Sequence, residues 1–295
     1  MRFRFFINRV FTVDKGESMD FIFYGEFSTT VRQKGIEETA RFAKEKGFSG
    51  VEFLESSAQG TTFTLQDIPS AKKTAEILRA HGLDVACYSV ECCLWADEVE
   101  NLKKHAELAS ALGSPFLHHT LIPWLALDEN SPSYEQAFEK IIERATEVAN
   151  YAKSLGLICL YEEQGMYFNG KGFDDFYLEI KRRCDNVGVC GDFGNDLFVD
   201  ENPVDFIEKY KTEIKHAHLK DYQFLPRSDQ SEKGAEWYKT KGGNYLKDCP
   251  LGAGVVEFDK AFHALQTSGY QGKYALEISL SMVDSGMAFA KRYAK

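Results

Sequence analysis

The sequence predicts an α/β protein, a single (β/α)8 TIM barrel that spans residues 1–295. An amphipathic helix, a glycine and a short apolar strand recur in that order five times. Two further helix–strand pairs lack the glycine, and one strand near the N-terminus brings the number of strands to eight. Strands that alternate with helices pair in parallel through right-handed crossovers, and eight such units close into a barrel.

The five glycine-containing units each place the glycine where a helix ends, at a position that needs a left-handed backbone. Their helices and strands cover residues 36–56, 70–90, 101–120, 138–163 and 258–279. The five glycines are Gly47, Gly82, Gly113, Gly156 and Gly269.

The other three strands are defined less sharply by the sequence. VGVCGD (187–192) follows the helix 173–186, and IKHAHLKD (214–221) follows the helix 202–213. Both FRFFIN and FIFYGE are suitable as the first strand, so its register stays open. Residues 222–256 are the least regular stretch and predict a long loop over the C-terminal face of the barrel, or an ordered surface insertion with a short helix.

The amino-acid composition limits the classes of binding partner and the cellular compartment that we expect for the protein. The net charge of −10 and the pI of about 5.3 argue against nucleic acid as a partner. The cysteines are odd in number, seven, and form no CxxC pair, which favours a reduced, cytoplasmic protein. No run approaches the roughly 20 apolar residues of a membrane span, so no membrane association is expected.

Four polar residues stand where four predicted strands end. Glu162 ends LICLYE, Asp192 ends GVCGD, His218 ends IKHAH, and Glu277 ends KYALE. The C-terminal ends of barrel strands meet around one pocket, so these side chains are expected to be neighbours there. Three carboxylates and an imidazole form a plausible set of ligands for a divalent metal ion.

Strand alternation selects between neighbouring candidates, because side chains two residues apart point to the same face. Ile158 and Leu160 make a good interior column, and Glu162 continues it, whereas Glu163 lies on the other face. His218 is nearer the end of its strand than His216, which is expected one layer deeper in the barrel.

Segments along nearly the whole chain resemble the xylose isomerase-like TIM-barrel superfamily of sugar phosphate isomerases and epimerases. The resemblance rests on AKEKGFSGVEF, AEILRAHGLDV, AELASALGSPFL, AKSLGLICLYE, VGVCGDFGN, IKHAHLKD, PLGAGVVEFDKAF and GYQGKYALE. It implies one divalent ion, commonly Mn²⁺, Mg²⁺, Co²⁺ or Zn²⁺. The metal ligands that it implies are again Glu162, Asp192, His218 and Glu277.

The implied reaction is isomerisation or epimerisation of a sugar or sugar phosphate by proton transfer through a metal-stabilised enediolate. In the ketose epimerases of the superfamily two ligating glutamates are also the acid and base, which carried over are Glu162 and Glu277. The runner-up is a keto-sugar or inosose dehydratase (a lyase), because proton abstraction beside a carbonyl also begins β-elimination. An apurinic endonuclease and a non-catalytic sugar-binding barrel are remoter alternatives.

The chain departs from the ketose 3-epimerase pattern around the predicted metal ligands. Asn195 stands where many relatives have a histidine, and Phe168 and Phe224 replace a glutamate and an arginine. Arg227 is close to the arginine position but out of register. These departures leave another sugar, a sugar phosphate, an inosose or a keto-sugar derivative as the expected small-molecule partner.

Several polar residues are expected to contact the substrate. Only one of the adjacent histidines in FLHHT can point inward. The superfamily commonly forms dimers and tetramers, so a homodimer or homotetramer is a further expectation. The substrate-binding candidates are Asn195, His118, His119, Lys220, Glu91 and Arg227.

Overall fold

Eight parallel strands close into a barrel in this computed structural model, which describes residues 19–56, 64–229, 231 and 233–294. The order around the barrel is β1, β11, β7, β6, β5, β4, β3, β2, so the chain closes when β1 pairs with both β2 and β11. The strands are β1 (Phe21–Phe23), β2 (Gly50–Ser56), β3 (Asp84–Glu91), β4 (Phe116–His119), β5 (Ile158–Tyr161), β6 (Val187–Asp192), β7 (Ile214–Leu219) and β11 (Lys273–Leu276).

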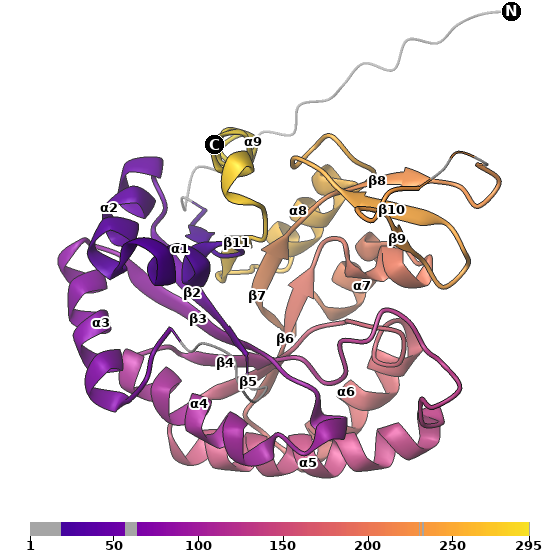
Figure 1. Cartoon of the computed structure of the whole chain (residues 1–295), viewed down its shortest axis with the longest axis horizontal. Coiled ribbons are helices and arrows are strands. Elements are labelled where there is room, and N and C mark those ends of the chain that lie inside the picture. Colours follow the sequence, from indigo (N-terminus) through magenta and orange to yellow (C-terminus); the bar gives the residue numbers. More distant parts are fainter. Residues whose placement is uncertain (1–18, 57–63, 230, 232, 295) are drawn as a thin grey trace, which may run out of the picture.

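Helices surround the strands on the outside (Figure 1). The five glycines that were predicted to end helices all have a positive φ, from 65° at Gly82 to 88° at Gly47, which confirms that part of the prediction. An ion pair joins the first and last parts of this ring of helices: Lys46 Nζ of helix α2 lies 2.6 Å from Asp284 Oδ1 of helix α9. The helices are α1 (Phe27–Lys34), α2 (Ile36–Lys46), α3 (Ile68–Ala80), α4 (Val99–Leu112), α5 (Tyr134–Ser154), α6 (Lys171–Arg183), α7 (Pro203–Tyr210), α8 (Phe258–Thr267) and α9 (Val283–Ala290).

The first strand is FIF of the FIFYGE segment, which settles the choice that the sequence left open. The alternative segment, FRFFIN, lies outside the described residues. The prediction of a loop over residues 222–256 was wrong in its details, because the segment contains a three-stranded antiparallel sheet instead of a long loop or a short helix. Its strands are β8 (Tyr222–Leu225), β9 (Tyr238–Lys239) and β10 (Tyr245–Asp248), in the order β8, β10, β9.

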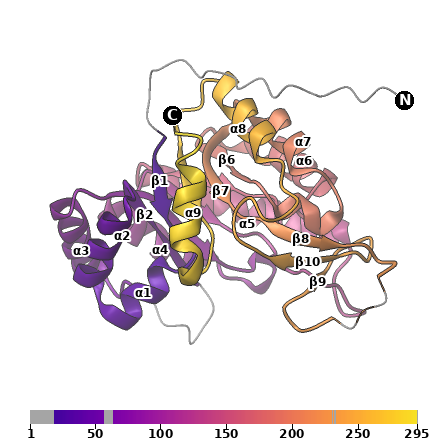
Figure 2. The same ribbon diagram turned by 90° about the horizontal axis from the view of Figure 1, so that it is seen from above.

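This small sheet lies on the opposite side of the molecule from α3 (Figure 2). It packs on the 3-10 helix Asn195–Val199, which follows β6: the Phe198 ring contacts the rings of Tyr222 and Tyr238 with centroids 5.4 and 5.8 Å away. Asp221, at the start of the segment, accepts hydrogen bonds from the backbone N–H groups of Gly252 and Gly254. The segment is therefore anchored at the C-terminal end of the barrel.

The interior of the barrel has an apolar part and a polar part. Leu160 and Cys190 are buried together with Cys87, and Ile158 packs against them, as alternation predicted for the β5 column.

All seven cysteines are free thiols. In the part of the chain that the structure describes, no helix is long and apolar enough to cross a bilayer.

Candidate metal centre

Four side chains converge at the C-terminal ends of four neighbouring strands. Asp192 ends β6 and His218 is the next-to-last residue of β7, while Glu162 and Glu277 directly follow β5 and β11. One ligand atom from each lies within 4.8 Å of the others. Because the barrel brings together residues far apart in sequence, the structure assembles the same four residues that strand-end position and alternation selected.

His218 presents one ring nitrogen to this cluster. Its Nδ1 atom lies 2.7 Å from Glu162 Oε1 and 3.5 Å from Glu277 Oε2. The ring is fully buried and stacks on Tyr24 with centroids 4.5 Å apart. Burial opposes the charged form, but the acidic groups of Cys190, Glu52 and Glu162 outweigh it and raise the pKa of His218 well above its usual value. The cluster therefore attracts positive charge.

The two carboxylate oxygens of Asp192 differ, because one accepts hydrogen bonds from the backbone and the other is available to a ligand. Its Oδ1 atom accepts hydrogen bonds from the backbone N–H groups of Gly194, at 2.8 Å, and Asn195, at 2.7 Å. Its buried Oδ2 atom makes no hydrogen bond to any described residue and lies 3.3 Å from Lys220 Nζ. Burial raises the pKa of Asp192 to about 7, although Lys220 opposes this. An orphaned buried oxygen that faces three other donors fits a divalent cation.

Lys220 and Asn195, both predicted to bind substrate, lie beside the four clustered side chains. Lys220 Nζ is 2.9 Å from Glu277 Oε1 and donates a hydrogen bond of 3.1 Å to Asn195 Oδ1. The buried Nδ2 atom of Asn195 makes no hydrogen bond within the described parts of the chain. The Glu277 side chain is 31% exposed, whereas that of Glu162 is 4% exposed. A ligand can therefore approach past Glu277.

Of the two adjacent histidines, only His118 faces the cluster. Its Nε2 atom lies 3.9 Å from Glu162 Oε2, is buried and has no hydrogen-bond partner among the residues described. Burial lowers the pKa of His118 to about 4. His119 turns away: its Nδ1 atom is 3.0 Å from Thr120 O, and its ring contacts Tyr161 edge to face. Strand alternation explains this opposite orientation.

The structure does not bring Glu91 or Arg227 to the four clustered side chains. Glu91 is exposed at the end of β3 and lines a separate cavity of about 330 Å³ with Arg32. Arg227 is exposed just after β8, and its backbone N–H donates to Asn244 Oδ1 at 2.9 Å. Arg227 lies between β8 and β9 of the small sheet, where its side chain is exposed, so its nearness in sequence to the family's arginine position does not bring it to the four clustered side chains.

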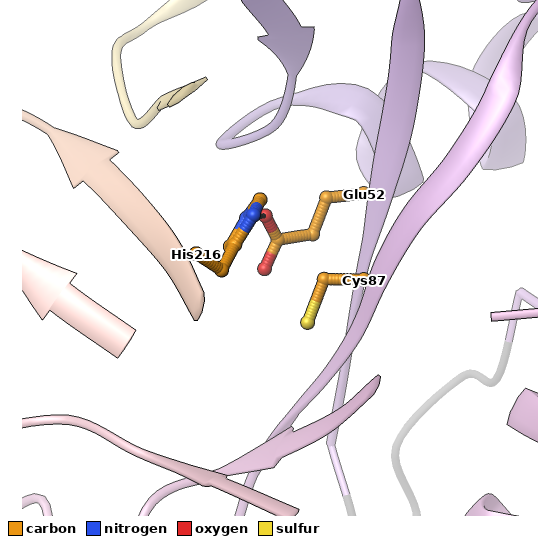
Figure 3. A group of neighbouring side chains, drawn as sticks. All are labelled: Glu52, Cys87 and His216. Atoms are coloured by element: carbon orange, nitrogen blue, oxygen red, sulfur yellow. Dashed lines mark hydrogen bonds and ion pairs between the residues drawn. The ribbon is translucent and has the colours of Figure 1, made fainter. Parts of the chain in front are cut away.

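Sequence reasoning missed Glu52, a fully buried carboxylate on β2. Its Oε2 atom lies 2.6 Å from His216 Nε2, and its Oε1 atom lies 3.1 Å from His218 Nε2. Figure 3 shows Glu52 and His216 reaching toward each other from opposite strands, with Cys87 nearby on β3. The signal was present in GVEFLES, where a carboxylate shares a strand face with Gly50 and Leu54.

Comparison with known proteins identifies one family over most of the chain. The model of the family described as xylose isomerase-like TIM barrel matches residues 40–293. Among curated proteins, an inosose dehydratase of Bacillus anthracis is 27% identical over 200 residues, which cover 61% of this chain. The match spans 63% of that relative's length.

Solved structures share the fold at low sequence identity. A xylose isomerase domain protein from Planctomyces limnophilus has a TM-score of 0.69 and 14% identity, with 94% of this chain and 96% of that chain covered. A D-allulose 3-epimerase from Methylomonas sp. has a TM-score of 0.67 and 14% identity, with 94% and 99% covered. A xylose isomerase-like protein from Mycobacterium smegmatis in complex with magnesium has a TM-score of 0.63 and 16% identity, with 88% and 86% covered.

Proposed function

The chain belongs to the xylose isomerase-like TIM barrel family, and from this premise we propose that it is a divalent-metal-dependent isomerase or epimerase of a sugar or sugar phosphate. The observation that carries the proposal is the cluster of Glu162, Asp192, His218 and Glu277, whose ligand atoms lie within 4.8 Å of one another. A divalent ion held there supplies a Lewis acid that polarises the carbonyl group of a bound hydroxy-ketone or hydroxy-aldehyde.

The protein's own side chains supply the proton transfers. Glu162 and Glu277 are the proposed acid–base pair, because each has a carboxylate oxygen within 3.5 Å of His218 Nδ1 and belongs to the proposed metal site. Removal of the proton on the carbon next to the carbonyl leaves an enediolate, and return of a proton to the neighbouring carbon or to the other face gives the isomer or epimer. Lys220 Nζ lies 2.9 Å from Glu277 Oε1 and is proposed to donate a hydrogen bond to a substrate oxygen.

The substrate is proposed to be a small sugar-like molecule that differs from the free ketoses of the 3-epimerases. Phe168, which replaces a glutamate, is 1% exposed, and its ring lies 5.6 Å from that of Phe176. Phe224, which replaces an arginine, is 41% exposed on the small sheet. Neither residue can supply the polar contact of the side chain that it replaces.

A second candidate, dehydration of an inosose or keto-sugar, is favoured by the 27% identity to an inosose dehydratase. The first step is the same, since a proton leaves the carbon beside the carbonyl. In this case hydroxide then departs from the next carbon, takes up a proton and leaves as water. The same residues can serve both reactions, so the two candidates differ in the fate of the enediolate.

The test is incubation of the metal-loaded protein with inososes, keto-sugars and sugar phosphates in D₂O. Deuterium on the carbon beside the carbonyl of a recovered isomer supports the isomerase or epimerase. A product that has lost water supports the dehydratase instead. If no substrate in the panel exchanges a hydrogen or changes structure, with Mg²⁺, Mn²⁺, Co²⁺ or Zn²⁺ supplied in turn, the catalytic proposal fails.

A further inference from the structure

A chain of hydrogen bonds runs through the barrel interior beneath the four clustered side chains, and Glu52 is its centre. Glu52 Oε1 receives hydrogen bonds from the Ser89 hydroxyl and from His218 Nε2, and Oε2 receives one from His216 Nε2. Ser89 Oγ in turn lies 2.9 Å from His118 Nδ1. All five side chains are at least 97% buried, so water cannot exchange these partners freely.

The carboxylate defines which nitrogen of His218 carries a proton. Three polar groups converge on its two oxygens, the Ser89 hydroxyl and His218 Nε2 on Oε1 and His216 Nε2 on Oε2, which is the arrangement expected of an ionised carboxylate. An ionised carboxylate can only accept hydrogen bonds, so His218 Nε2 must be the donor in their 3.1 Å contact. With Nε2 as the donor to Glu52, Nδ1 is the ring atom that faces Glu162 and Glu277, and its lone pair would bind a divalent ion that replaces the Nδ1 proton.

The same carboxylate defines the proton position on His118 through Ser89. A serine hydroxyl has one proton, and Ser89 donates it to Glu52. Toward His118 the hydroxyl oxygen can only accept, so His118 Nδ1 is the donor in the 2.9 Å contact. In the neutral ring Nε2 is then an acceptor, and this atom is buried 3.9 Å from Glu162 Oε2 with no partner among the described residues.

We propose that Glu52 is a positioning residue that fixes the tautomers of both His218 and His118. His218 Nδ1 is thereby held as a metal ligand, and His118 Nε2 is held as an acceptor for a hydroxyl group of the substrate. The inference rests on the proposed function, because it assigns roles in the same site. It restricts the substrate to molecules that present a hydroxyl, and not an ether or carbonyl oxygen, to His118.

A second metal site beneath the first does not account for the same residues. Glu52, Cys87 and His216 offer donor atoms within 4.8 Å of one another, and Figure 3 shows them grouped. However, both oxygens of Glu52 already accept hydrogen bonds from three side chains. A cation there would have to displace the His216 hydrogen bond of 2.6 Å.

The tautomers can be read directly by two-bond ¹H–¹⁵N correlation spectra of the histidine rings in the Mg²⁺- or Zn²⁺-loaded wild-type protein. The His218→Gln and His118→Gln variants assign the signals. We expect His218 to be protonated at Nε2 and bound to the metal through Nδ1, and His118 to be protonated at Nδ1. A proton on His118 Nε2, or metal bound to His218 Nε2, overturns the inference without substrate being present.

Variants of the hydrogen-bonded chain test cause and effect. Glu52→Leu removes the acceptor and is expected to weaken Mg²⁺ or Zn²⁺ binding by about 10- to 100-fold. Glu52→Gln retains one acceptor oxygen and is expected to weaken binding less. Ser89→Ala removes the connection from Glu52 to His118 but keeps the hydrogen bond between Glu52 and His218. It should therefore leave metal affinity within about threefold of wild type, while His118 loses its single tautomer.

The control is Glu55→Gln on the same strand. Glu55 is also buried, but it accepts hydrogen bonds from the Ser28 hydroxyl and the Thr64 backbone instead of from a histidine. We expect wild-type metal affinity and histidine spectra in this variant. A folded Glu52→Leu protein with wild-type affinity and tautomers overturns the inference and leaves the proposed function standing. If Glu52→Leu does not fold, the wild-type spectra and Glu52→Gln decide. A wild-type protein that binds no divalent ion overturns both.

Discussion

Lys220 Nζ lies 2.9 Å from Glu277 Oε1, so a buried cation from the end of β7 meets the most exposed carboxylate of the site. The same amine lies 3.3 Å from Asp192 Oδ2. Burial opposes its charge, but Asp192 and Glu277 outweigh that effect and raise the pKa of Lys220 well above its usual value. Lys220 therefore compensates part of the negative charge of the cluster.

Replacement of Lys220 by methionine is expected to destabilise the metal-free protein by about 3 kcal/mol, because it leaves buried carboxylates without their partner. Saturating Mg²⁺ should restore part of this loss, since a divalent cation compensates the same carboxylates. Thermal and urea unfolding with and without Mg²⁺ measure both effects. Lys215→Met, at an exposed position on the same strand, is the control. Equal unfolding free energies for the two variants would contradict this role of Lys220.

Glutamine substitutions at two adjacent positions, Glu162 and Glu163, test which of the two carboxylates is needed for activity. Glu162→Gln is expected to lower kcat by at least about 100-fold, because it removes a residue proposed to be both a metal ligand and a base. Burial, together with Asp196 and Asp192, raises the pKa of Glu163 well above its usual value, and its Oε1 atom accepts a hydrogen bond from the Asp192 backbone N–H that a glutamine oxygen can also accept. Glu163→Gln should therefore keep kcat within about threefold of wild type. Steady-state kinetics on the substrate found in the D₂O panel test this, and the reverse order of effects would refute the assignment.

The acid stability of the protein is expected to depend on His105 of α4, which is not one of the four clustered side chains. His105 is fully buried, with Nδ1 3.0 Å from the Tyr88 hydroxyl, and burial lowers its pKa from 6.5 to about 4. Between these two values the unfolded chain binds a proton that the folded protein does not. Stability is therefore present above pH 6.5 and is lost as the pH falls toward 4, by up to about 3 kcal/mol.

Urea unfolding of wild type and His105→Gln from pH 7.5 to 4 measures this contribution. The variant is expected to be less stable at neutral pH, but its stability should fall less steeply below pH 6.5. His263→Gln removes an exposed histidine and should follow the wild-type curve. Parallel curves for wild type and His105→Gln would contradict the assignment.

Periodic patterns predicted the barrel because each unit repeats the same local chemistry. Gly47 and Gly113 end helices in the left-handed conformation that their positions required, and the β5 column of Ile158 and Leu160 faces the interior. The segment after Asp221 has no such repeat. Its antiparallel sheet depends on the packing of Phe198 against Tyr222 and Tyr238, which sequence spacing does not reveal.

The position of a residue at a strand end predicted the four clustered residues, but it could not predict Glu52. Glu52 lies in the middle of a predicted strand. Its partner Ser89 comes from the adjacent strand β3, but His216 and His218 come from β7, which does not pair with β2 and faces it across the barrel interior. The direction of His118, and the exposure of Arg227, likewise depend on tertiary structure. Strand alternation limits the direction of a side chain to one of two faces, but it does not predict which residue that side chain contacts.

Calorimetric titration of Mg²⁺, Mn²⁺, Co²⁺ and Zn²⁺ into metal-free protein tests whether the four clustered side chains hold a divalent ion. We expect one ion per chain in wild type, with at least about 100-fold weaker binding in Asp192→Asn and His218→Gln, whose far-UV spectra should match wild type. Glu163→Gln, beside the cluster, should bind as wild type does. A wild-type chain that binds none of the four ions, or variants that bind as tightly as wild type, would contradict the account.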